Sequence, residues 1–160
     1  FARRKPAAFT KGTEMKLSIK GILIGGITDI VLSSLLGVVL AIFVTAMPEV
    51  SAAPKEQMGK AALAAIHAHP LLHALQLAIG FLCSVAGGYV AAKLAKQSEL
   101  PNAALASWLC VGLGIYSLAT RQGDETTAIH LVLIALTPCA YVAGGYLRVK
   151  TSGHRAVSPA

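Results

Sequence analysis

Charged residues are scarce in this chain, and the scarcity excludes a water-soluble globular domain as its main body. Aspartate, glutamate, lysine and arginine make up 13% of the 160 residues, whereas a soluble domain usually carries about 25%. Hydrophobic residues reach 55%, and the mean hydropathy is +0.66. Lipid is therefore the expected solvent. Four apolar stretches, each near the roughly 20 residues that cross the bilayer core, use nearly all of the length and leave no room for a second domain.

The sequence also lacks the short motifs of common catalytic and nucleotide-binding sites. It contains no G-x-S-x-G, H-E-x-x-H, C-x-x-C or phosphate-binding loop. The neighbouring carboxylates Asp124 and Glu125 lie in a polar turn and do not form a catalytic pair. The three cysteines all lie inside apolar stretches, where they are interpreted as small buried hydrophobic residues. We therefore expect neither an enzyme nor a bound cofactor.

Prolines and polar segments divide the chain into four predicted membrane spans. Pro48 ends the first span, Pro70 opens the second, Pro101 precedes the third, and a polar turn precedes the fourth. The longest connection, 48–69, includes a predicted short surface helix. The predicted boundaries are a basic tail at 1–20, a transmembrane domain at 21–150 with spans at about 21–47, 70–95, 103–120 and 126–147, and a second tail at 151–160.

The basic residues predict the orientation of these spans. Eleven of the 14 lysines and arginines lie in the N-terminal tail, between spans two and three, or at the C-terminal end, and the exceptions are Lys55, Lys60 and Arg121. The positive-inside rule then places both termini in the cytoplasm. Basic residues at span ends contact anionic lipid, so the net charge of +7 indicates a bilayer as partner and not a nucleic acid.

Spans two and four resemble each other without gaps at an offset of 57 residues. Val-Ala-Gly-Gly-Tyr at 85–89 is repeated at 142–146, and Lys93 aligns with Lys150. Spans one and three match more weakly. The pattern predicts a duplicated helical hairpin whose two copies share one topology, which is a parallel repeat. The expected fold is an all-α, integral membrane four-helix bundle.

The Ala-Gly-Gly-Tyr element at 86–89 and 143–146, followed by a lysine four residues later, resembles small uncharacterised four-span bacterial membrane proteins. The resemblance covers about a tenth of the chain. It implies a four-helix membrane fold in a bacterial inner membrane, and it implies no activity.

Small residues along the spans are predicted to bring the helices together. Lipid tails are as apolar as leucine, so membrane helices associate mainly through close contact of small side chains. The predicted packing residues are Gly21, Gly25, Gly80, Ser84, Gly87, Gly88, Ala140, Gly144 and Gly145. The predicted anchors at the cytoplasmic interface are Tyr89, Tyr146, Trp108, Lys93 and Lys150. The alternative interpretation is a ligand cleft lined by the glycines.

Asp29 is the first candidate for chemistry, because a carboxylate near the middle of the bilayer costs at least ~2.5–3.5 kcal/mol and normally marks function. Counting about 1.5 Å per residue places Gly112, Thr137 and Pro138 at the same depth. A neutral Asp29 is predicted to bond to Thr137, to Ser33, or to the carbonyl of Ile134 that Pro138 leaves unpaired. It acts either as a structural hydrogen-bonding group or as a site for a proton or cation.

The histidines are the second candidate site. His67, His69 and His73 cluster where the long connection enters span two, and His130 is expected at an equivalent depth in span four. Imidazole suits zinc or copper, which makes these four residues a candidate metal site on the outer face. The competing interpretation is a symmetric hydrogen-bonded pair of His73 and His130.

Three functions follow from these patterns. The leading one is a structural or accessory membrane protein that packs against itself, as a homo-oligomer, or against a larger membrane complex. The alternative is a small proton- or cation-coupled transporter or channel that uses Asp29, with Pro138 as its flexible point. The third is a metal-binding membrane protein. No catalytic residue is proposed.

Overall fold

The computed structural model describes residues 17–95, 98–120 and 127–155, with the side chains of 127–130 and 153–155 left undescribed. This part of the chain is helical and contains no strand. Its helices are α1 (Ile19–Thr45), α2 (Pro48–Ser51), α3 (Met58–Ala68), α4 (Pro70–Ala95), α5 (Glu99–Thr120) and α6 (Thr127–Arg155).

Four of these helices, α1, α4, α5 and α6, are long and apolar enough to cross a membrane. The shortest, α5, has 22 residues, or about 33 Å at 1.5 Å per residue, which matches the thickness of a hydrocarbon core. Large apolar side chains are exposed along all four, for example Leu35, Leu82, Ile115 and Val132. Contact with lipid removes the penalty that such exposure would carry in water.

Local sequence sets most helix ends. The Ser18 side chain accepts a hydrogen bond from the backbone N–H of Gly21 and caps α1. Pro48 and Pro70 lie in the first turns of α2 and α4. Proline is tolerated there because a backbone N–H in the first turn has no acceptor within the helix, so its loss costs no hydrogen bond. The predicted second span, 70–95, coincides with α4, and α1 begins and ends two residues before the predicted 21–47.

Two predicted ends differ from the structure. Helix α5 begins at Glu99, four residues before the predicted start, because Pro101 lies in its first turn, where proline is tolerated. Asn102 is fully buried there, and its side chain joins α5 to the start of α1 by accepting from the Ser18 N–H at 2.7 Å. Helix α6 continues to Arg155, eight residues past the predicted 147, so the predicted tail at 151–160 begins as helix.

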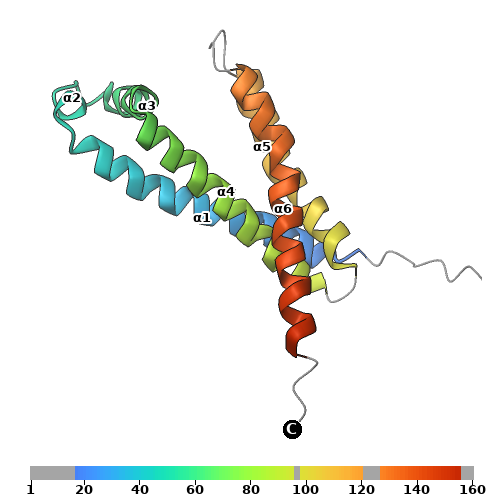
Figure 1. Cartoon of the computed structure of the whole chain (residues 1–160). Helices are drawn as coiled ribbons and strands as arrows, with labels where there is room; N and C mark the ends of the chain where they lie inside the picture. The colour runs from blue at the N-terminus through green and yellow to red at the C-terminus, as the bar shows by residue number, and fades with distance from the viewer. Residues whose placement is uncertain (1–16, 96–97, 121–126, 156–160) are drawn as a thin grey trace, which may run out of the picture.

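The long helices form two antiparallel pairs, α1 with α4 and α5 with α6 (Figure 1). The pairs cross near the end where α1 and α5 begin and α4 ends, and α4 packs against both α5 and α6 there. Toward their other ends the pairs diverge, so that α2 and α3 lie far from the top of α5 (Figure 1). The arrangement produces a V whose closed end holds the tightest packing.

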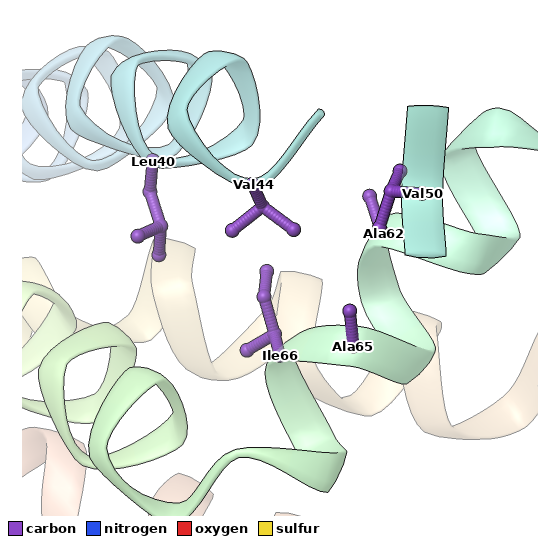
Figure 2. Close-up of a cluster of buried hydrophobic side chains, with 6 residues drawn as sticks. All are labelled: Leu40, Val44, Val50, Ala62, Ala65 and Ile66. Carbon is purple, nitrogen blue, oxygen red and sulfur yellow. The ribbon is translucent and has the colours of Figure 1, made fainter. Parts of the chain in front are cut away.

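The connection between α1 and α4 is mostly helical, and it folds back onto the end of α1. Figure 2 shows the apolar cluster that holds it, made by Leu40, Val44, Val50, Ala62, Ala65 and Ile66. Val44 and Val50 are almost completely buried. The predicted surface helix at 55–67 corresponds to α3, whose apolar face turns toward α1 and whose other face stays exposed. We refer to this unit, residues 48–69, as the cap.

Candidate functional site

Asp29 lies at the closed end of the V, where all four long helices meet. It is on the third turn of α1, and only 3% of its surface is exposed. Its partners are Ser84 on α4, Cys110 on α5 and Tyr141 on α6. One carboxyl group is thus bonded to every other long helix, and no other described group joins all four in this way.

The three hydrogen bonds converge on a single oxygen. The Tyr141 hydroxyl donates to Asp29 Oδ2 at 2.8 Å, the Ser84 hydroxyl at 2.9 Å and the Cys110 thiol at 3.2 Å. Tyr141 and Cys110 also contact each other, with 3.3 Å between hydroxyl oxygen and sulfur. All three donors are neutral, so they stabilise a negative charge on Asp29 without cancelling it.

Glycines on α4 allow Tyr141 to reach the carboxyl group. A Cβ added at Gly87 would stand 2.8 Å from the Gly25 carbonyl oxygen and 3.2 Å from the Tyr141 hydroxyl. A Cβ at Gly88 would overlap the backbone carbonyl of Tyr141. Because the backbones of α1, α4 and α6 approach this closely, a tyrosine on α6 is completely buried with its hydroxyl at Asp29.

A cavity of about 730 Å³ extends from Asp29 toward the cap. Side chains of α1, α3, α4 and α6 form most of its wall, and Cys110 of α5 reaches its inner end beside Asp29. His67 and His73 lie at the cap end, where their ring centroids are 5.2 Å apart. Ser33, Gln76 and Thr137 add polar groups, and leucine, isoleucine, phenylalanine, alanine and glycine make up the rest of the wall.

The charge at the inner end of this cavity has no opposite charge beside it. No described lysine, arginine or histidine forms an ion pair with Asp29, whose recorded partners are the three neutral donors. A buried carboxylate without a cation is costly in a medium of low dielectric constant. A carboxyl group in this position is a candidate site for a cation.

The sequence prediction for the partners of Asp29 requires correction. The hydroxyl of Ser33 bonds to the carbonyl of Ile30, and that of Thr137 bonds to the carbonyl of Leu133, each within its own helix. Both residues instead line the cavity beside Asp29. Pro138 does lie inside α6, at the turn before Tyr141.

The predicted packing residues fall into two groups. Gly21 and Gly25 lie against α4, Gly88 and Gly144 lie between α4 and α6, and Gly145 contacts Ala103 of α5. The others differ. Gly80 has no atom within 4 Å of an added Cβ and lines the cavity, Ala140 is buried at the cavity wall, and Ser84 is a donor to Asp29.

The predicted interface anchors are mostly on the surface. Trp108 is 69% exposed and Tyr146 is 58% exposed, Tyr89 is half-buried, and Lys93 and Lys150 are exposed near the ends of α4 and α6. Their place at the interface of a bilayer stays a prediction.

The described histidines of the candidate metal site, His67, His69 and His73, do not gather at one point. His69 contacts Glu49 of the cap, with 3.2 Å between Nε2 and Oε1, whereas His67 and His73 lie against each other. A backbone hydrogen bond lowers the pKa of Glu49, and the contact with His69 lowers it further. Among the side chains that the structure describes, no three histidine, cysteine or acidic groups gather as metal ligands. His130 lies outside the described side chains, which leaves its pairing with His73 a prediction.

None of the three donors to Asp29 was predicted as its partner. Ser84 was predicted to pack helices, Cys110 was interpreted as a buried hydrophobic residue, and Tyr141 was not a candidate. One signal was present. At the offset of 57 residues that relates spans two and four, Ser84 aligns with Tyr141, so the two hydroxyl donors hold equivalent positions in the predicted repeat. The depth count failed for α5 because this helix begins four residues early, which shifts the matching level from Gly112 toward Cys110.

Comparison of the chain with protein-family models, with curated proteins and with solved structures finds no match. The resemblance of the Ala-Gly-Gly-Tyr element therefore stays a prediction, and the functional argument depends on the geometry of the site.

Proposed function

We propose that this small multi-pass membrane protein is a proton- or cation-coupled transporter in which Asp29 binds a proton and a cation alternately. One observation carries the proposal. Asp29 is a buried carboxyl group at the inner end of a cavity of about 730 Å³, and its partners are neutral donors. Ionisable groups with this placement inside membrane spans typically mark ion or substrate pathways.

The same geometry explains coupling. The hydrogen bonds from Tyr141, Ser84 and Cys110 hold Oδ2 in place. Burial away from water opposes the charge, so that neutralisation by a proton or by a cation restores the balance. A single carboxylate binds one or the other, and the binding of each is therefore linked to release of the other.

The proposed orientation places the cap end of the cavity on the outer face of the membrane. Both termini are assigned to the cytoplasm of a bacterial inner membrane because most lysines and arginines lie in the two terminal segments and between spans two and three. The cap, with Lys55 and Lys60, then lies outside. In this orientation the cap end of the cavity faces the exterior, and transport requires the two helix pairs to rearrange, for which Pro138 in α6 supplies a flexible point.

Proton flux in proteoliposomes tests the proposal. We expect an imposed gradient of a monovalent cation, either sodium or an organic ammonium, to drive proton movement in the opposite direction through the wild-type protein. The Asp29→Asn variant should abolish this movement. Glu49→Gln is the matched control, because it makes the same carboxyl-to-amide change at an exposed residue of the cap. Flux that persists in Asp29→Asn, in a protein that elutes normally from a sizing column, would exclude this role.

A structural or accessory role is the second candidate, and a face of α5 supports it. Gly112 has open space beside it, and the exposed Trp108, Leu113 and Tyr116 lie on the same helix. A small residue on a lipid-facing helix allows another helix to approach closely, either from a second copy or from a larger complex. Purification in mild detergent tests this role, and a strictly monomeric particle without a copurifying protein would count against it.

A further inference from the structure

We propose that the cavity binds a monovalent amphipathic organic cation whose protonated amine donates a hydrogen bond to Asp29 Oδ1 and whose apolar part lies along α4 and α6. This inference rests on the proposed function and adds a substrate class to it. Three properties of the site lead to it: its single charge, its one available carboxyl oxygen, and its apolar walls.

The charge of the site fits one positive charge. Asp29 is the one acidic residue that lines the cavity within the described residues. Calcium takes six to eight oxygen ligands, and magnesium requires near-octahedral coordination. No cluster of three potential metal ligands exists among the described side chains. A singly charged group with its own apolar substituents satisfies the site better than a bare divalent ion.

The hydrogen bonds of Asp29 indicate what the positive group must carry. All three described donors end on Oδ2. Oδ1 accepts none of these hydrogen bonds, and Asp29 lines the cavity. An oxygen of a carboxylate in such a place prefers a charged N–H donor. Ammonium groups with an N–H should therefore bind better than quaternary ones.

The walls and length of the cavity indicate an apolar body. From Ser84 to His73, both of which line the cavity, α4 rises through eleven residues, or about 16 Å. The volume of about 730 Å³ falls within the roughly 300–1,000 Å³ of sites that enclose drug-sized ligands. Leu77, Phe81 and Leu136 are among the apolar side chains of this wall.

Two glycines provide a matched test of occupancy. Gly80 lines the cavity and Gly112 does not, and neither has an atom within 4 Å of an added Cβ. A leucine at Gly80 would extend into the cavity, whereas a leucine at Gly112 would extend into the space beside α5. Both changes replace glycine inside a helix, so their effects on helix propensity cancel in the comparison.

Binding to the full-length protein in nanodiscs provides the experiment. The probes are 4-phenylbutylammonium, the neutral 4-phenylbutanol, and 4-phenylbutyl-trimethylammonium, which lacks an N–H. We expect the ammonium to bind at least about tenfold more tightly than either of the others, since a hydrogen bond to a charged group contributes about 1.5–3 kcal/mol. Gly80→Leu should remove the binding, and Gly112→Leu should preserve it.

The outcomes separate this inference from the proposed function. Asp29→Asn should reduce the affinity for the ammonium to that for the alcohol. If Asp29→Asn proves unstable, the comparison of ammonium binding between Gly80→Leu and Gly112→Leu tests the inference instead. Equal affinity for the three probes, or binding that survives Gly80→Leu, overturns the substrate class. Proton flux that still depends on Asp29 would then leave the transporter proposal in place. Proton flux that does not depend on Asp29 would contradict both the transporter proposal and the proposed substrate class.

Discussion

The contact between Gly88 and Tyr141 allows a sharp test of how the site is assembled. An alanine at position 88 adds one methyl group, and that methyl group would overlap the carbonyl of Tyr141. Helices α4 and α6 must then separate, which moves Tyr141 away from Asp29. An alanine at Gly80, two turns earlier on the same helix, meets no atom within 4 Å.

The difference between these two variants can be estimated. Overpacking costs about 1–3 kcal/mol, and a hydrogen bond between membrane helices contributes about 0.6–1.7 kcal/mol. The gain in helix propensity from glycine to alanine, about 0.5–1 kcal/mol, is common to both variants and cancels. Gly88→Ala should therefore be less stable than Gly80→Ala by about 2–5 kcal/mol.

Unfolding in mixed micelles with increasing mole fraction of a denaturing detergent measures this difference, with helicity followed by circular dichroism. We expect Gly80→Ala to unfold at or above the wild-type midpoint and Gly88→Ala well below it. Equal midpoints for the two variants would refute the close approach of α4 and α6, and with it the burial of Tyr141.

Three further predictions concern Tyr141, the buried cluster of the cap, and the contact between Glu49 and His69. Tyr141→Phe should destabilise the protein by about 0.6–1.7 kcal/mol in the same unfolding assay, because it removes one donor and leaves the ring in place. Ile66→Ala, in the buried cluster of the cap, should cost about 2–5 kcal/mol and speed proteolysis within 48–69, whereas Ile42→Ala on an exposed face should not. The contacts of Glu49 lower its pKa in the folded protein. The stability that this carboxylate contributes is therefore present above its pKa in the unfolded chain, and it is lost as the pH falls through its pKa in the folded protein. The stability difference between wild type and Glu49→Gln should therefore vanish in acid, and a difference that grows there would contradict the contact.

Much of the helical architecture could be predicted, because each helix carries its own signal. Twenty or more apolar residues indicate a span wherever they occur, and Pro48 and Pro70 mark ends by their geometry alone. The end of α6 could not be predicted in this way. Apart from Val149, residues 148–155 are polar or glycine, and a polar segment can continue a helix beyond the hydrocarbon without any change in pattern.

The site was predicted only in part. Asp29 is conspicuous in an apolar segment, and the energetic cost of a carboxylate there is enough to indicate function or a buried partner. Its partners depend on the relative depth and rotation of four helices, and a shift of four residues in the start of α5 moves the expected level by about 6 Å. The glycines were predicted to pack helices, but sequence alone did not distinguish Gly88, which admits Tyr141, from Gly80, which borders the cavity.

The pH dependence of cation binding tests the central claim, that a proton and a cation share Asp29. The measurement is calorimetry of 4-phenylbutylammonium binding in buffers with different ionisation enthalpies, which counts the protons released as the cation binds. We predict that wild type releases protons as the cation binds, one for each cation that displaces a proton from Asp29, and that Asp29→Asn releases none. Binding by wild type that is independent of pH from acid to neutral, without release of protons, would contradict the account.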